Sequence, residues 1–346
     1  MKASCKYGSH RVLEPKGALP QAAIRLDNNP TCGDNECLID VQILNIDSAS
    51  FHQIKQASHH DEAVMAAMIQ DIVKSRGKMQ NPVTGSGGML IGTVREVGPN
   101  FHNQDLTPGT PIATLVSLTL TPLIIEEITA IVLEHDQVHI TGTAVLFDSG
   151  VYAVLPNDLD ETLVLAALDV AGAPPQMARL ARQGDTVFVL GAAGKSGLLC
   201  VAQARQSVGL NGRVIGLVNE PEQQALLEEL GWCDHIILAD AKDALEVYKA
   251  VQVVTEGQMV DLSVNVVNIS DTEMTSMMVT KEGGTVYFFS MATSFQKAAL
   301  GAEGIGKDIT MIIGNGYAKD HADFTLNLLR NTPELLDIFK TRYTKT

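Results

Sequence analysis

The strongest chemical signal is a glycine-rich turn, in which an apolar strand ending at Leu190 runs into a helix-like apolar sequence that begins at Leu198. Such a turn offers backbone N–H groups and the positive end of a helix to a pyrophosphate. Its glycines stand where a side chain would block the phosphates or hold the helix away from the strand. The turn therefore predicts a dinucleotide site with contacts from Gly191, Ala193, Gly194, Lys195, Ser196 and Gly197.

The turn departs from the strict G-x-G-x-x-G pattern, because Ala192 stands where the first glycine would be. A glycine-rich turn alone also fits an ordinary tight connection between a strand and a helix. However, residues 212–218 follow as a second strand after a helix of suitable length, which completes the βαβ unit that the motif requires. Dinucleotide binding is therefore the interpretation that we favour.

Further cofactor contacts are expected where later parallel strands end, because their carboxyl ends face the ligand crevice in this architecture. The expected ends of the fourth and fifth strands supply Val266, Val267, Asn268, Ser290, Met291 and Ala292. After the second strand, Val218 takes the place of the aspartate that hydrogen-bonds the ribose of NAD, and Asn219 follows it. This arrangement leaves both NAD and NADP open.

Two aspartates are candidates for amine binding or proton transfer. Asp47 follows the expected strand 37–45 and precedes a serine-rich sequence, so an alternative is that it caps a helix. Asp169 lies in an apolar helix sequence, where a buried carboxylate costs free energy unless it is paired. A structural ion pair is therefore an equal alternative to a functional role for Asp169.

The polar, glycine-rich loop at residues 81–88 is a candidate for binding a substrate carboxylate or amine. Backbone groups and hydroxyls would make the contacts, and the candidates are Asn81, Thr84 and Ser86. The alternative is a surface turn, which proline and glycine favour by themselves. Both interpretations stay open.

Composition limits the class of protein. A chain of 346 residues that is 45% hydrophobic exceeds what one core usually serves, so two domains are expected. The net charge of -15 argues against a nucleic-acid partner. No apolar run reaches the roughly 20 residues that span a bilayer, and no signal peptide is apparent, so we expect a cytoplasmic protein. Five cysteines without a C-x-x-C pair indicate reduced thiols and no metal.

The pattern of elements divides the chain. Residues 1–157 are expected to form a β-rich domain with a helical insertion at 51–77. Residues 158–318 alternate helices and strands, which predicts a six-stranded parallel sheet covered by helices, and 319–346 adds C-terminal helices. The expected strands are 37–45, 87–98, 111–117, 137–141, 144–147, 185–190, 212–218, 235–238, 261–267, 285–290 and 308–314, and one helix is expected from 161 to about 182.

This order resembles the medium-chain dehydrogenase/reductase superfamily. Residues 92–98 are similar to its "GxVxxVG" strand, 108–113 to its "PGDxVA" sequence and 281–286 to its "xxGGxxV" sequence. The resemblance implies an α/β chain with a GroES-like N-terminal domain, a Rossmann domain and a homodimer through the sixth strand. Where zinc members have a cysteine ligand and a His-Glu pair, this chain has Asp47 and Gly88-Met89, so we expect no zinc.

A narrower resemblance is to the L-erythro-3,5-diaminohexanoate dehydrogenase family of lysine fermentation, carried by residues 45–51, 78–89, 168–174 and 287–292. It implies an oxidoreductase that deaminates 3,5-diaminohexanoate to 5-amino-3-oxohexanoate and ammonium with NAD or NADP. Oxidation at the amine-bearing carbon needs a base to deprotonate the ammonium, which suits a carboxylate in a zinc-free site. The alternatives are a zinc-independent quinone or enoyl reductase, and a non-catalytic nucleotide-binding protein.

Overall fold

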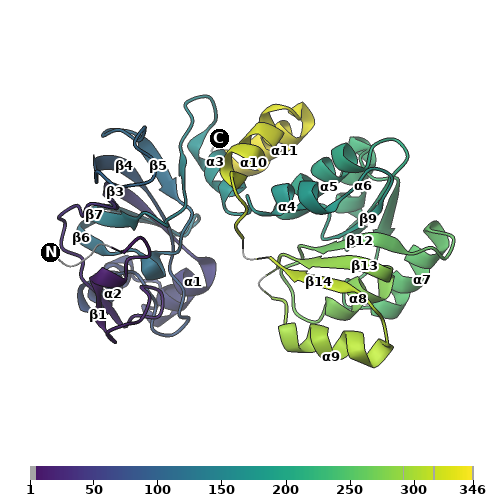
Figure 1. Cartoon of the computed structure of the whole chain (residues 1–346), viewed down its shortest axis with the longest axis horizontal. Helices are drawn as coiled ribbons and strands as arrows, with labels where there is room; N and C mark the ends of the chain where they lie inside the picture. The colour runs from purple at the N-terminus through teal and green to yellow at the C-terminus, as the bar shows by residue number, and fades with distance from the viewer. Residues whose placement is uncertain (1–4, 291, 315, 345–346) are drawn as a thin grey trace. The chain divides into compact units, whose positions relative to one another are not determined.

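The computed structural model describes residues 5–290, 292–314 and 316–344, which form two compact units, Met1–Asp158 and Leu159–Thr346 (Figure 1). Met291, one of the expected cofactor contacts, lies outside the described residues. Within the described ranges, no helix combines the length and the apolar character needed to cross a bilayer.

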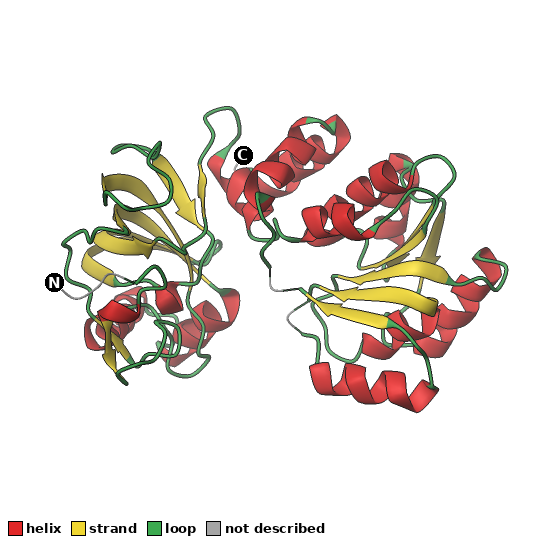
Figure 2. Ribbon diagram, viewed as in Figure 1, coloured by secondary structure: helices red, strands yellow, loops and turns green. Residues whose placement is uncertain are grey.

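The N-terminal unit is built on one antiparallel sheet, whose strands are yellow in Figure 2. The strand order is β6-β7-β3-β4-β5-β8. Its strands are β3 (Glu36–Ile46), β4 (Gly88–Val97), β5 (Pro111–Thr114), β6 (Leu123–Val132), β7 (Gln137–Phe147) and β8 (Tyr152–Val154). A small pair, β1 (Val12–Glu14) and β2 (Arg25–Leu26), and two 3-10 turns, Ser9–Arg11 and Leu118–Leu120, complete it.

Two helices, α1 (Ser48–Ala57) and α2 (Glu62–Arg76), occupy the connection between β3 and β4. Phe51 and Ile54 of α1 and Met65 and Ile69 of α2 are fully buried in the same apolar cluster as the sheet. The expected insertion is therefore a pair of helices that completes the core of this unit.

Two strand predictions in this unit need correction. The segments expected as separate strands at 137–141 and 144–147 are one strand, β7, because Gly142 lets the chain continue close to β6. A Cβ on Gly142 would lie 2.2 Å from the carbonyl oxygen of Ile124. Strand β6 itself was not predicted, because it is an edge strand whose adjacent Glu126 and Glu127 interrupt the apolar alternation.

The C-terminal unit contains a six-stranded parallel sheet with the order β11-β10-β9-β12-β13-β14. The strands are β9 (Thr186–Leu190), β10 (Arg213–Val218), β11 (His235–Leu238), β12 (Val260–Asn265), β13 (Thr280–Phe288) and β14 (Thr310–Ile313). The helices are α3 (Glu161–Leu168), α4 (Ala173–Leu180), α5 (Lys195–Val208), α6 (Pro221–Leu230), α7 (Ala244–Val254), α8 (Glu273–Val279), α9 (Phe295–Ile305), α10 (His321–Arg330) and α11 (Pro333–Tyr343). This is the doubly wound nucleotide-binding order, so the predicted fold class is confirmed.

The single helix expected from residue 161 to about 182 is instead two helices, α3 and α4. Pro174 and Pro175 lie in the first turn of α4, where a missing N–H costs no helical hydrogen bond. Further inside a continuous helix, the same prolines would remove hydrogen bonds and clash with the preceding turn. The break places Asp169 at the C-terminal end of α3.

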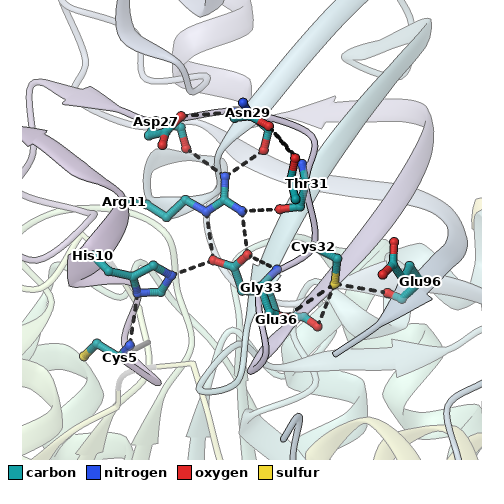
Figure 3. A network of polar contacts seen from close by, with 10 residues as sticks. All are labelled: Cys5, His10, Arg11, Asp27, Asn29, Thr31, Cys32, Gly33, Glu36 and Glu96. Atoms are coloured by element: carbon teal, nitrogen blue, oxygen red, sulfur yellow. Dashed lines mark hydrogen bonds and ion pairs between the residues drawn. The ribbon is translucent and has the colours of Figure 1, made fainter. Parts of the chain in front are cut away.

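A buried ion-pair network attaches residues 10–31 to β3 in the N-terminal unit (Figure 3). The Glu36 carboxylate is fully buried and accepts hydrogen bonds from Arg11 Nε at 2.8 Å, Arg11 Nη2 at 2.5 Å and the Gly33 N–H at 2.8 Å. His10 Nε2 lies 2.7 Å from the same carboxylate. Arg11 also donates to the backbone carbonyls of Asn29 and Thr31, each at 2.7 Å.

These donors lower the pKa of Glu36. Burial alone would raise its pKa, but the hydrogen bonds from Arg11 and His10 and the charge of Arg11 outweigh burial and bring the pKa from 4.5 to about 2. The folded carboxyl group therefore binds a proton less readily than the unfolded one. Its contribution to stability is complete above pH 4.5 and is lost as the pH falls towards about 2.

We expect Glu36→Gln to destabilise the N-terminal unit by about 3 kcal/mol at pH 7, because it leaves the buried Arg11 guanidinium without a counter-charge. It should also flatten the loss of stability between pH 5 and pH 2, roughly the interval set by the shifted pKa. Urea unfolding midpoints measured across this pH range check both effects.

The matched control is Asp40→Asn on the same strand, whose partner Arg95 is exposed. An exposed pair contributes about 1 kcal/mol or less, so this variant should unfold almost as the parent does. Equal midpoints for the two variants at pH 7 would contradict the role given to Glu36.

Candidate functional site

The glycine-rich turn lies between β9 and α5, as expected. The N–H groups of Gly191 and Ala192 both donate to the carbonyl of Leu217 on β10, at 3.1 Å. Gly191 has φ +82°, a conformation that favours glycine. A Cβ on Gly197 would lie 2.0 Å from the Gly191 carbonyl oxygen, so α5 can begin this close to β9 only with glycine at 197.

Gly194 is a position in the turn where the absence of a side chain leaves space for a ligand. It is exposed and has φ -73° and ψ 174°, which any residue can adopt. A Cβ at Gly194 would approach only the Gly191 carbonyl oxygen, at 3.4 Å, so the protein itself has room for a side chain there. The neighbouring N–H groups of Lys195, Ser196 and Gly197 belong to the first turn of α5, where helices leave N–H groups unpaired. This open, donor-lined surface suits a pyrophosphate.

Asp169 and Lys195 form an ion pair beside the turn. Lys195 Nζ lies 2.5 Å from Asp169 Oδ2, and the Asp169 side chain is 59% exposed. The expectation that this carboxylate is buried is therefore wrong, because the helix break places it at the exposed end of α3. The same ammonium lies 5.9 Å from the ring centroid of Tyr343.

Most of the other expected cofactor contacts lie just beyond the carboxyl ends of strands. Strand β12 ends at Asn265 and β13 at Phe288, earlier than expected. Val266, Val267, Asn268, Ser290 and Ala292 therefore lie in the loops that follow these strands, and Asn219 is exposed directly after β10.

A buried asparagine that sequence reasoning missed connects these loops. Asn265 Nδ2 donates to Thr272 Oγ1 at 2.9 Å and Ser276 Oγ at 3.0 Å. Its Oδ1 accepts from the Val267 N–H at 3.2 Å, and its carbonyl accepts from the Ser290 N–H at 3.3 Å. A polar residue at the end of an otherwise apolar strand was the available signal.

In the N-terminal unit, Asp47 is the N-cap of α1. Its Oδ1 accepts from the Ser50 N–H at 3.1 Å, so the capping alternative is correct for one oxygen. Its Oδ2 is buried and has no hydrogen-bond partner among the described residues. A buried carboxylate oxygen without a donor is costly, so Asp47 Oδ2 is an acceptor for a water molecule or for a donor group of a ligand.

Three hydroxyls lie next to this cap. Ser50 Oγ is 2.6 Å from Thr84 Oγ1 and 2.8 Å from Ser86 Oγ, which are themselves 3.1 Å apart. The structure thus brings the expected residues Thr84 and Ser86 together with the start of α1. Ser50, which is fully buried and was not predicted, is the residue that connects them.

Asn81, the third residue expected in the loop, is fully buried and makes hydrogen bonds within the protein. Its Nδ2 donates to Gln53 Oε1 at 2.8 Å, and its Oδ1 accepts from the Val83 N–H at 2.8 Å. These contacts shape the loop 81–88 against α1. Direct contact between Asn81 and a substrate stays a prediction.

The position where zinc dehydrogenases carry a ligand pair is filled by backbone here. Gly88 has φ +110°, and a Cβ on it would lie 2.0 Å from the Asn45 carbonyl oxygen and 2.8 Å from the Asp47 nitrogen. Across the part of the chain that the structure describes, no group of three or more His, Cys, Asp or Glu side chains could hold a metal ion.

Comparison with known families agrees with this division. The model for the L-erythro-3,5-diaminohexanoate dehydrogenase N-terminal domain matches residues 10–156. A model described as zinc-binding dehydrogenase matches residues 197–325. An alcohol dehydrogenase of Thermotoga maritima has a similar fold, with a TM-score of 0.53 and 17% identity over 89% of this chain and 85% of that chain.

Two curated relatives match almost the whole chain. L-erythro-3,5-diaminohexanoate dehydrogenase of Acetoanaerobium sticklandii is 55% identical over 98% of this chain and 99% of its own. The protein of the same name from Fusobacterium nucleatum subsp. nucleatum is 54% identical over 99% of this chain and 100% of its own. The chain therefore belongs to the L-erythro-3,5-diaminohexanoate dehydrogenase family.

Proposed function

We propose that this protein oxidatively deaminates L-erythro-3,5-diaminohexanoate to 5-amino-3-oxohexanoate and ammonium, as a cytoplasmic step of lysine fermentation. The names of its full-length relatives support the substrate. The single structural observation that carries the chemistry is Asp47 Oδ2, a buried carboxylate oxygen without a partner among the described residues. An ammonium group is a donor that such an oxygen requires.

The Rossmann unit would hold the cofactor through the turn at 191–197 and the loops after β10, β12 and β13. A bound nicotinamide supplies a hydride acceptor. We propose NAD as the cofactor, because Asn219 is followed by the exposed acidic residues Glu220 and Glu222, which would repel the 2′-phosphate of NADP.

Asp47 would bind the substrate ammonium at C3 and accept its proton, which frees the nitrogen lone pair to drive hydride departure from C3. Water then adds to the resulting iminium, and proton transfer to nitrogen releases ammonium and leaves the ketone. The Asp47 carboxylate can return the proton in this second stage. Thr84 and Ser86 offer hydroxyls beside Asp47 that can hydrogen-bond polar groups of the substrate.

Asp169 is the second candidate for amine binding or proton transfer. Its carboxylate is exposed and is paired with Lys195 of the cofactor turn, a contact in which an ammonium group could replace that of Lys195. We also propose that the reaction needs no zinc, because residues 45–47 and Gly88 pack backbone against backbone where a ligand set would be required.

The direct test is NADH formation on adding 3,5-diaminohexanoate, followed at 340 nm with NAD or NADP and with or without a chelator. We expect turnover that prefers NAD and is unchanged by the chelator. Cofactor reduction that a chelator abolishes would contradict the zinc-free site, and NAD(P)H oxidation by quinones alone would contradict the proposed substrate.

Asp47→Asn should lower kcat about a hundredfold or more while the Kd for NADH stays within about twofold, because the amide keeps the cap but cannot accept the ammonium proton. The control is Asp61→Asn, which changes the N-cap of α2, where Asp61 Oδ1 accepts at 2.9 Å and 3.1 Å. Equal losses of activity in both variants would contradict the role of Asp47 as a proton acceptor.

Gly194→Ala and Gly197→Ala should separate ligand binding from folding. Gly194→Ala should leave the melting temperature of the cofactor-free protein nearly unchanged but weaken NADH binding about tenfold or more, since its methyl group would occupy ligand space. Gly197→Ala should lower the melting temperature, with a cost of about 1–3 kcal/mol or more from the clash with Gly191. Wild-type NADH affinity in Gly194→Ala would refute this turn as the cofactor site.

We also propose a homodimer through β14. This strand is at one edge of the parallel sheet, and Ile313 on β14 and Phe295 and Leu300 on the neighbouring α9 are exposed. Ile313→Lys should convert the dimer to a monomer in light scattering coupled to gel filtration. Leu238→Lys at the opposite edge strand, β11, is the matched control and should remain dimeric. A wild-type monomer would exclude the proposal.

A further inference from the structure

The end of helix α11 contacts the glycine-rich turn although more than 140 residues separate the two in sequence. Arg342 Nη1 donates to the Ala193 carbonyl at 2.9 Å. Both residues lie in the C-terminal unit, so this contact is internal to one compact body. None of the motifs of the turn predicts it, because Arg342 belongs to a helix beyond the last strand.

Two hydrogen bonds, one at the carbonyl and one at the N–H, hold the peptide plane between Ala193 and Gly194. The Ala193 carbonyl and the Gly194 N–H belong to the same planar peptide unit. Arg342 holds the carbonyl, and the Gly194 N–H donates to the Gly191 carbonyl at 3.1 Å. Because Gly194 is the N-cap of α5, the orientation of this peptide sets the direction in which the helix starts. It therefore sets where the N–H groups of Lys195 and Ser196 point.

Helix α11 is held within the C-terminal unit by buried side chains and a contact with α3. Its Leu335 and Phe339 side chains are fully buried, and Thr162 Oγ1 on α3 lies 2.6 Å from the Tyr343 carbonyl oxygen and 2.5 Å from Asp160 Oδ1, the two acceptors that share its single proton. The rings of Phe339 and Tyr343 lie 5.2 Å apart. An arginine on such a helix is held near its acceptor, which lowers the entropy cost of the contact.

Lys195, the first residue of α5, is held by the same two helices. Its ammonium is paired with Asp169 at the end of α3 and lies 5.9 Å from the Tyr343 ring centroid. Ala193 is thus attached to α11, and Lys195 is attached to both α3 and α11. The first half of the turn, by contrast, is attached to β10 through Leu217.

From this geometry we propose that Arg342 and Thr162 are positioning residues for cofactor binding, which hold the 193–195 part of the turn in the conformation that receives a pyrophosphate. The inference rests on the proposed nicotinamide site. Arg342 acts through Ala193 and requires no contact of its own with the cofactor.

Two measurements on Arg342→Ala test this inference. In the cofactor-free protein, amide hydrogen exchange of the peptide covering 191–197 should become about tenfold faster, because the carbonyl anchor is lost. The Kd and KM for NADH and NAD should rise about three- to tenfold, which corresponds to the loss of one ordinary hydrogen bond. The KM for the diamino acid and kcat at saturating cofactor should change little.

Three further variants separate positioning from general destabilisation. Arg342→Lys keeps a cation that can reach the carbonyl and should restore part of the cofactor affinity. Thr162→Val removes the attachment of α11 to α3 and should reproduce the exchange and Kd changes in weaker form. Lys340→Ala, an exposed change on the same helix, should leave both unchanged.

Unchanged exchange at 191–197 in Arg342→Ala would overturn the inference, whatever the protein binds. So would a loss of kcat without a change in cofactor Kd, or equal effects in Lys340→Ala. If the wild-type protein binds no NADH but Arg342→Ala still shows faster amide hydrogen exchange at the turn, the proposed function is wrong. The role of Arg342 in holding the turn is then still supported.

Discussion

The contact between Gly197 and the Gly191 carbonyl is the constraint on which the C-terminal unit depends. A single methyl group at residue 197 would lie 2.0 Å from that oxygen, so the start of α5 can lie against the end of β9 only without one. This close approach lets α5 cover the centre of the sheet, where Leu198, Leu199 and Val201 are fully buried. It also directs the unpaired N–H groups of the first turn of α5 away from the packed interior. Folding and ligand binding thus use the same turn, but through different glycines.

In the N-terminal unit, Asp47 likewise combines a role in folding with the proposed role in binding. One carboxylate oxygen stabilises the start of α1 in the ordinary way, whereas the other is buried and has no donor among the residues that the structure describes. Folding alone would favour a serine or threonine there, since a hydroxyl can cap a helix without a buried charge. Ser50 connects this cap to Thr84 and Ser86 of the 81–88 loop, which makes the loop part of the same polar cluster.

Sequence reasoning succeeded where the signal is local. The glycine-rich turn after β9, strand β11 and the presence of C-terminal helices after residue 319 follow from apolar periodicity and from glycine and proline positions, and the structure contains all of them. It failed where contacts between segments far apart in the sequence determine the local structure. The sequence predicts two strands in place of β7, because Gly142 is a residue typical of turns. In the structure, Gly142 instead allows the close approach of β6. Asp169 was expected to be buried because the prolines of α4 were not recognised as starting a new helix.

The sequence by itself determined the two-part organisation, the parallel nucleotide-binding sheet and the turn that serves it, because glycine, proline and apolar spacing act over a few residues. It also singled out Asp47, Thr84 and Ser86. Only the tertiary structure decided that one oxygen of Asp47 lacks a partner within the described part of the chain, that Ser50 connects the hydroxyls, that Asn265 joins two loops and that Arg342 reaches Ala193. Hydrogen-bond partners are set by distances between segments far apart in the chain, and such distances exist only once the chain has folded.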